Sequence, residues 1–145
     1  MAKSSKKTKW NKEQADRNLK TGVAFLAENA LRPEVTTNIS GLQYEILEAG
    51  TGIIPDIRSQ VMCHYTGYLL DGTVFDDSYK SDRPEIFYVY ELIPAWIEAL
   101  TLMPSGSKWK LYVPPHIGYG LEPLTPESGG NCTLIFEMEL IRIIK

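Results

Sequence analysis

The sequence predicts an α+β domain in which an antiparallel sheet wraps one short helix, preceded by an N-terminal helix. Apolar residues recur every three or four positions in residues 11–30 and again in residues 93–100, which is typical of helices. Between and after these segments the apolar period falls to two, which is typical of strands. Asp71 and Gly72 join two of the extended runs as a hairpin turn would.

Length and composition favour one domain with an appendage. The chain has 145 residues, of which 43% are hydrophobic, and this is enough for a core. It lacks a run of about 18 or more apolar residues, so we expect no membrane span. Its positive N-terminus lacks the apolar run of a secretory signal, so we expect a cytoplasmic protein. Two cysteines, Cys63 and Cys132, give no disulfide framework, and buried free thiols are the favoured interpretation.

Charge is unevenly distributed along the chain. Residues 1–20 hold seven Lys/Arg and two Asp/Glu, whereas the remainder holds eight and sixteen, for a net charge of −3. A basic leader could contact nucleic acid or an acidic partner, but it is more often a solvated tail. The rest of the chain has no basic patch interleaved with aromatic residues, so we expect no nucleic-acid binding.

The predicted N-terminal helix covers residues 11–30. Asn11 and Gln14 resemble a capping pair, and Pro33 stops the helix soon after its end. An isolated helix of this length is marginal in water, so its apolar stripe should pack on something, either the body of the protein or the same helix in a second copy. We divide the chain into a basic tail with a linker helix, residues 1–35, and a domain over residues 36–145. The stripe consists of Ala15, Leu19, Val23, Leu26 and Ala30.

The body of the chain alternates strand and turn signals. "LQYEIL", "IFYVY", "KWKLYV" and "CTLIFEMELIRII" are predicted strands, and "QVMCHYTGYLLDGTVFDDS" predicts a hairpin with a type I′ turn over residues 70–73. The short helix over residues 93–100 has Pro94 in its first turn, where its missing N–H costs nothing. One face of the last strand should hold Cys132, Leu134, Phe136, Met138 and Leu140.

The titratable residues do not predict a nucleophile or a metal site. Cys63 and His64 are adjacent in a strand, so their side chains point to opposite faces and cannot form a nucleophile–base pair with each other. We interpret His64 as a hydrogen-bonded structural histidine. His116 lies in a loop, and two histidines without a carboxylate at ligand spacing make a poor metal site. Asp76 and Asp77 are also adjacent, so at most one faces inward, and a second inward acid for a carboxylate pair is not evident.

Aromatic residues are the remaining signal. A core is the ordinary explanation for them. The alternative is a shallow apolar pocket with a few polar handles, because Asp76 and two phenols accompany them. The six residues come from five segments around the short helix: Tyr65, Phe75, Phe87, Trp96, Tyr119 and Phe136.

Four collinear stretches resemble one known family. "HYTGYLLDGTVFDDS", "LIPAWIEAL", "MPSGSKWKLYVPPHIGYG" and "NCTLIFEMEL" are similar to an FKBP-type peptidyl-prolyl cis-trans isomerase, and the resemblance covers residues 41–145. "GVAFLAENA" followed by "GLQYEIL" resembles the linker helix and domain start of the bacterial, Mip-like branch. The resemblance implies a five-stranded antiparallel half-barrel around a short helix. It also implies an enzyme of protein folding that rotates X-Pro bonds without covalent chemistry, metal or cofactor.

The resemblance also implies roles for individual residues. Trp96 would form the pocket floor, the Ile93 N–H and the Tyr119 hydroxyl would donate to a ligand carbonyl, and Asp76 would accept from Tyr65. The implied catalytic residues are Tyr65, Asp76, Phe75 and Tyr119, and the implied substrate-binding residues are Phe87, Leu92, Ile93, Trp96 and Phe136.

Partners and departures follow from the same resemblance. It implies proline-containing polypeptide clients, a chaperone-like role and macrolide immunosuppressant-type ligands; we expect a monomer, with a homodimer as the alternative. Ala95 stands where the family usually has Gly, and Glu85 where many relatives have an aromatic residue. Residues 128–130, Ser-Gly-Gly, stand where Ile-Pro-Pro is usual, so we expect no apolar cover over the ligand and an effect on rate or drug affinity. A non-catalytic prolyl-peptide-binding or chaperone-like module is the alternative function.

Overall fold

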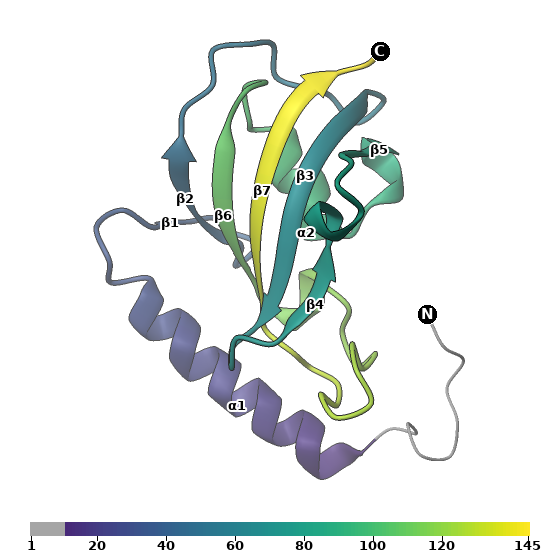
Figure 1. Ribbon diagram of the computed structural model, residues 1–145. Coiled ribbons are helices and arrows are strands. Elements are labelled where there is room, and N and C mark those ends of the chain that lie inside the picture. The colour runs from purple at the N-terminus through teal and green to yellow at the C-terminus, as the bar shows by residue number, and fades with distance from the viewer. Residues whose placement is uncertain (1–10) are drawn as a thin grey trace.

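A computed structural model describes residues 11–145; the first ten residues, which hold much of the predicted basic tail, lie outside the described part. Helix α1 (Lys12–Asn29) precedes an antiparallel sheet, which packs against the short helix α2 (Pro94–Leu100) (Figure 1). The predicted α+β class is confirmed. None of the described helices combines the length and the hydropathy that a membrane crossing requires.

The sheet contains seven strand segments. They are β1 (Thr36–Thr37), β2 (Gln43–Glu48), β3 (Gln60–Leu69), β4 (Val74–Asp77), β5 (Glu85–Tyr88), β6 (Lys108–Val113) and β7 (Leu134–Ile143). The order is β1-β2-β6-β7-β3-β4, and β5 also pairs with β3. Because β4 and β5 pair with successive parts of β3, they share one edge. Apart from the two-residue β1, the sheet therefore has the five strand positions that the family resemblance implied.

The turn between β3 and β4 is not the predicted type I′ turn. A type I′ turn needs positive φ at both central residues, but within residues 70–73 only Gly72 has a positive φ, 90°. Gly72 N–H donates to the Leu69 carbonyl at 3.0 Å, and Leu69 N–H donates to the Thr73 carbonyl at 2.8 Å. This pattern is a type I turn followed by a left-handed glycine. The Asp71 carboxylate accepts from Thr73 N–H at 2.9 Å, and this local bond stabilises Asp71 without left-handed backbone.

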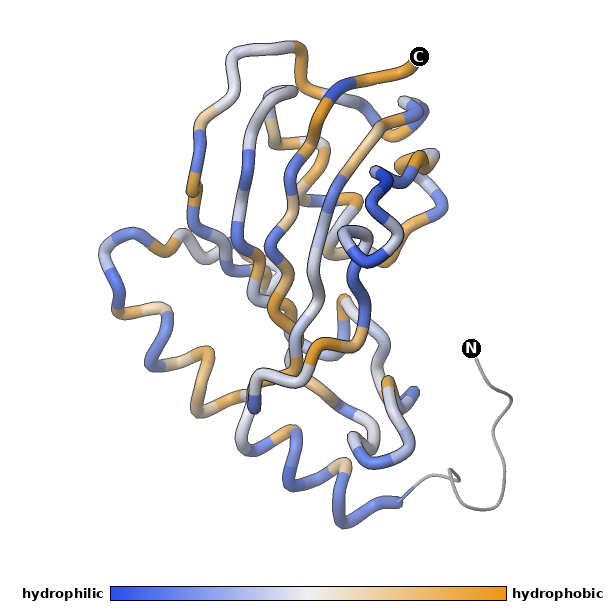
Figure 2. Tube along the Cα trace, in the orientation of Figure 1, coloured by the Kyte–Doolittle hydropathy of each residue, from blue (hydrophilic) through white to orange (hydrophobic). Residues whose placement is uncertain are grey.

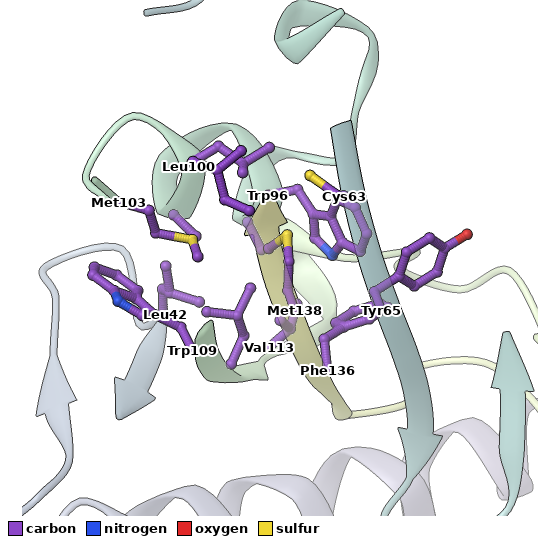
Figure 3. Close-up of a cluster of buried hydrophobic side chains, with 14 of the residues drawn as sticks. Leu42, Cys63, Tyr65, Trp96, Leu100, Met103, Trp109, Val113, Phe136 and Met138 are labelled. Atoms are coloured by element: carbon purple, nitrogen blue, oxygen red, sulfur yellow. The ribbon is translucent and has the colours of Figure 1, made fainter. Parts of the chain in front are cut away.

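The hydrophobic core lies between the sheet and α2. Hydrophobic and hydrophilic positions alternate along β7 (Figure 2), and the predicted inner face of its segment is buried throughout. Trp96 and Leu100 of α2 pack on this face, and Pro94 starts the helix as expected. Figure 3 shows the resulting cluster, in which the rings of Tyr65, Trp96 and Phe136 gather beside β3 and β7.

Helix α1 docks on the body of the protein, which is one of the two arrangements that its sequence left open. Asn11 Oδ1 caps the helix by accepting from Gln14 N–H at 3.1 Å, as predicted. At the other end the Asn29 side chain donates to Gln43 Oε1 at 2.8 Å, and both side chains are buried. Between these ends Gly22 lies so close to Thr133 that a Cβ at position 22 would collide with its hydroxyl.

The docked face of α1 differs from the predicted apolar stripe. Ala15 is fully buried, but Leu19 is 42% exposed and Val23 is 60% exposed. The predicted stripe was wrong at these two positions and at Ala30, which is also exposed, because close approach at Gly22 and the hydrogen bonds of polar residues decide which face packs. Apolar spacing reports neither of these. The docked face consists of Ala15, Asn18, Gly22, Phe25, Leu26 and Asn29.

Candidate functional site

Trp96 is the centre of a group of aromatic rings. Its side chain projects from α2 and is only 4% exposed. The rings of Tyr65, Phe136 and Phe87 lie 4.8, 5.2 and 5.8 Å from it between centroids, at interplanar angles of 85°, 86° and 88°. Edge-to-face contacts of this kind stabilise aromatic groups beyond the area they bury. The arrangement fixes the indole as a rigid floor.

These rings line a cavity of about 270 Å³. Eight of the nine predicted site residues line it: Tyr65, Asp76, Phe87, Leu92, Ile93, Trp96, Tyr119 and Phe136. The ninth, Phe75, is not among the lining residues and packs edge-to-face on Phe136 at 5.6 Å between ring centroids. Gly67 leaves the room for this contact, because a Cβ there would press on both phenylalanine rings.

The mouth of the cavity carries a phenol between two carboxylates. The Tyr65 hydroxyl lies 3.1 Å from Asp76 Oδ2 and 3.3 Å from Glu85 Oε2. Burial raises the pKa of Tyr65, and the charges of Asp76 and Glu85 raise it further. Burial also raises the pKa of Tyr119, with a contribution from Asp76. Both phenols are therefore neutral hydrogen-bond donors at physiological pH.

One side-chain donor and one backbone donor around the floor have no partner in the described part of the chain. The buried Trp96 Nε1 donates to no acceptor there. The Ile93 carbonyl caps α2 by accepting from Trp96 and Ile97 N–H, whereas the Ile93 N–H donates to no acceptor within residues 11–145. Free donors at an apolar cavity are suited to binding a carbonyl oxygen of a ligand.

The potential nucleophiles lie in structural positions. His64 Nδ1 lies 2.7 Å from Ser78 Oγ, and its ring stacks on Tyr79 at 4.1 Å, so the predicted structural histidine is confirmed. Cys63 and Cys132 are buried free thiols, as predicted. Burial raises the pKa of Cys63 to about 12, which makes its thiolate scarce. Across residues 11–145, groups of three or more His, Cys, Asp or Glu that could hold a metal ion are not found.

Sequence reasoning missed Glu91. This residue ends the 3-10 helix Val89–Glu91 and lines the cavity directly before Leu92. Its carboxylate accepts from Tyr88 N–H at 3.3 Å. The signal that could have found Glu91 was its place immediately before two residues already assigned to the pocket.

The loop after Tyr119 is hydrogen-bonded to α1. Asn18 Nδ2 donates to the carbonyls of Ser128 and Gly130 at 2.7 and 2.8 Å. Residues 121–131 contribute no side chain to the lining of the cavity. This position is consistent with the expected loss of an apolar cover at residues 128–130.

Two family models match the chain. The model described as FKBP-type peptidyl-prolyl cis-trans isomerase matches residues 53–141. The model described as a domain amino terminal to FKBP-type peptidyl-prolyl isomerase matches residues 1–46. Together the two models account for the body of the chain and for its N-terminal helix.

Curated relatives cover most or all of the chain. An outer membrane protein MIP of Legionella longbeachae is 45% identical over 145 residues, which is 100% of this chain and 61% of the relative. An FKBP-type 22 kDa peptidyl-prolyl cis-trans isomerase of Escherichia coli is 46% identical over 123 residues, which is 85% of this chain and 60% of the relative. The chain therefore spans about three fifths of the length of these relatives. These relatives do not support the expected cytoplasmic location, which stays a prediction.

Solved structures have the same fold. The crystal structure of FkpA from Escherichia coli has a TM-score of 0.85 and 35% identity, covering 91% of this chain and 62% of that chain. A peptidyl-prolyl cis-trans isomerase from Pseudomonas syringae has a TM-score of 0.81 and 33% identity, covering 90% of this chain and 96% of that chain.

Proposed function

The chain belongs to the FKBP-type peptidyl-prolyl cis-trans isomerase family, and from this premise we propose that its aromatic cavity accelerates rotation about X-Pro bonds of polypeptides. The observation that carries the proposal is the buried Trp96 floor, which three edge-to-face rings enclose and to which neutral donors are adjacent. The family acts on proline-containing substrates. The chain covers only part of its longer relatives, so its own activity and clients are what we propose.

The reaction needs no bond to be broken. Resonance gives the C–N bond partial double-bond character, and the barrier to rotation is about 18–20 kcal/mol. Both isomers of an X-Pro bond are populated, and their exchange takes tens to hundreds of seconds. An enzyme that stabilises the twisted transition state relative to the planar amide is sufficient, and lowering the barrier by about 5 kcal/mol accelerates exchange by roughly 10³- to 10⁴-fold.

The cavity has the polarity that this differential effect requires. A planar amide is more charge-separated than a twisted one, so an apolar, water-poor site favours the twisted form relative to water. The Trp96 floor supplies the apolar surface for the proline ring. The Ile93 N–H and the Tyr119 hydroxyl would hold carbonyl oxygens of the substrate while the bond rotates.

Tyr65 and Asp76 would act by position rather than by proton transfer. The raised pKa of Tyr65 keeps its phenol protonated, and its hydroxyl is engaged by the carboxylates. Asp76 therefore orients the Tyr65 ring and contacts the rim of the ligand. Proline-containing folding clients and macrolide-type ligands both fit an apolar floor with donors at the mouth.

A prolyl-peptide-binding module without catalysis is the second candidate, because residues 121–131 contribute no side chain to the lining of the cavity. Refolding of a protein whose slow phase is limited by X-Pro isomerisation separates the two functions. We expect catalytic amounts of this protein to accelerate the slow phase. A module that only binds would slow refolding or leave it unchanged.

Chelation tests the absence of a required cofactor. We expect the acceleration of refolding to be the same with and without EDTA, because the proposed action depends on the aromatic floor and on backbone and phenol donors. Activity that EDTA abolishes and zinc restores would contradict a mechanism without metal.

A further inference from the structure

Three carboxylates surround one side of the cavity mouth. Asp76 and Glu91 line the cavity, and Glu85 lies 3.3 Å from the Tyr65 hydroxyl that also contacts Asp76. We call these three residues the rim carboxylates. They come from β4, from the start of β5 and from the turn before α2, so the fold brings together charges that are up to fifteen positions apart in the sequence.

The rim carboxylates have no basic partner in the described part of the chain. The ion pairs found there involve Lys12 and Arg32, both of which belong to the N-terminal region. Lys80 and Arg83 lie in the segment between β4 and β5, but neither forms an ion pair with a rim carboxylate within 4.0 Å. The negative charge at the mouth is therefore available to a ligand.

The cavity beside this charge has an apolar floor with an unpaired polar atom. Trp96, which forms the floor, is 4% exposed. Its Nε1 donor is buried and has no hydrogen-bond partner within residues 11–145. The charged rim and the unsatisfied floor thus belong to one cavity with an apolar bottom and a negative edge.

We propose that the rim carboxylates select polypeptides in which a cationic side chain, Lys or Arg, directly precedes the proline. This selectivity rests on the proposed function, since it places the proline ring on the Trp96 floor. The preceding side chain then reaches the mouth, where its apolar stem packs along Phe87 and Tyr65 and its charged end meets the carboxylates. An acidic residue at the same position meets like charge and is disfavoured.

Matched proline peptides test this selectivity. Four peptides differ only in the residue before proline: lysine or its neutral analogue norleucine, and glutamate or its neutral analogue glutamine. NMR exchange measurements give kcat/KM for isomerisation without a coupling protease, whose own specificity would interfere, and titrations of the same peptides give the dissociation constants. We expect kcat/KM for the lysine peptide to exceed that for norleucine by about three- to ten-fold at low ionic strength, the range of one or two partly exposed ion pairs. The glutamate peptide should fall below glutamine, and both ratios should approach one at about 0.5 M salt.

Charge-neutral variants locate the effect. Glu85→Gln should lower the lysine-to-norleucine ratio by about two- to three-fold, because it removes one charge and keeps a hydrogen-bond acceptor for Tyr65. The matched control Glu28→Gln, on an exposed part of α1, should leave the ratio as it is. Should Glu85→Gln lose its fold, as judged by thermal unfolding, Glu91→Gln carries the same test.

The outcomes separate the selectivity from the proposed function. A lysine-to-norleucine ratio of one or less, or a ratio unchanged in the rim variant, overturns the selectivity while isomerisation of the norleucine peptide still supports the isomerase. If no peptide is isomerised but the lysine peptide binds more tightly than norleucine, the isomerase fails and the selectivity stands for binding. If no peptide binds or is isomerised, both proposals are overturned.

Discussion

The Tyr65 hydroxyl donates to Asp76 at 3.1 Å across the β3–β4 pair, at the mouth of the aromatic cavity. The register that pairs Gly67 with Asp76 brings the carboxylate to this phenol, and Gly67 keeps space for the rings behind it. The bond links the strand edge to the cavity wall, so it defines the geometry of the mouth.

Replacing Asp76 should weaken the activity without abolishing it. Asp76→Ala removes a hydrogen bond to a charged group, worth about 1.5–3 kcal/mol, so kcat/KM on a proline peptide should fall about ten-fold or somewhat more. Asp77→Asn is the matched control, because Asp77 caps the next turn by accepting from Tyr79 N–H. A folded Asp76→Ala protein without residual activity would show that Asp76 takes part in the chemistry itself.

Gly22→Ala should destabilise the protein although it improves helix propensity. Alanine in a helix interior gains roughly 0.5–1 kcal/mol over glycine. The new Cβ would collide with Thr133, however, and overpacking of this kind costs about 1–3 kcal/mol. Urea unfolding measures the difference, with Lys20→Ala on the exposed side of α1 as control. A stabilised Gly22→Ala protein would mean that α1 does not dock on Thr133.

Deletion of residues 1–35 should separate stability from catalysis. The deletion removes the Asn29–Gln43 and Asn18–Ser128 hydrogen bonds and exposes buried surface, so the melting temperature should fall. The residues that line the cavity all lie between Tyr65 and Phe136, so a short proline peptide should still be isomerised. If the truncated protein is folded but inactive on that peptide, α1 contributes to the active site.

The free energy of unfolding should decrease at alkaline pH. Burial raises the pKa of Cys63 from its ordinary value of 9.0 to about 12 in the folded protein. As the pH rises, the unfolded chain therefore loses the Cys63 proton before the folded protein does. The contribution of Cys63 to the free energy of unfolding is complete below pH 9 and is lost as the pH rises toward 12. The slope is at most about 1.4 kcal/mol per pH unit from this group. Urea unfolding of the Cys63→Ala protein should show a smaller decrease, and equal decreases in both proteins would contradict this assignment.

Several elements could be predicted because local patterns specify them. Asn11 caps α1 as its side chain predicts, Pro94 starts α2, and β6 covers the residues of "KWKLYV". Helix caps and strand alternation depend on neighbours within a few positions, so the local sequence contains all of the relevant information.

The sequence predicted most of the residues that line the cavity, but not which of the aromatic rings face it. Seven of its lining residues lie in the four family-like stretches, which preserve the spacing between segments. The same motifs do not report which rings face the cavity: Phe75 was assigned to the pocket, but it is not among the residues that line it, and it packs edge-to-face on Phe136. Glu85 and Glu91 were not assigned to the pocket, because they reach its mouth only through the pairing of β5 with β3 and the turn that follows.

The sequence by itself determined the element types, their order and the apolar floor, because these follow from periodicity, caps and long collinear motifs. Tertiary structure alone decided which face of α1 docks, since Gly22 and Asn18 act through contacts with residues more than a hundred positions away. It also decided that Tyr65 meets two carboxylates rather than one. Hydrophobic spacing indicates that a segment tends to be buried. Which residues it packs against, and which charged groups lie beside it, depends on how segments distant in the sequence approach one another.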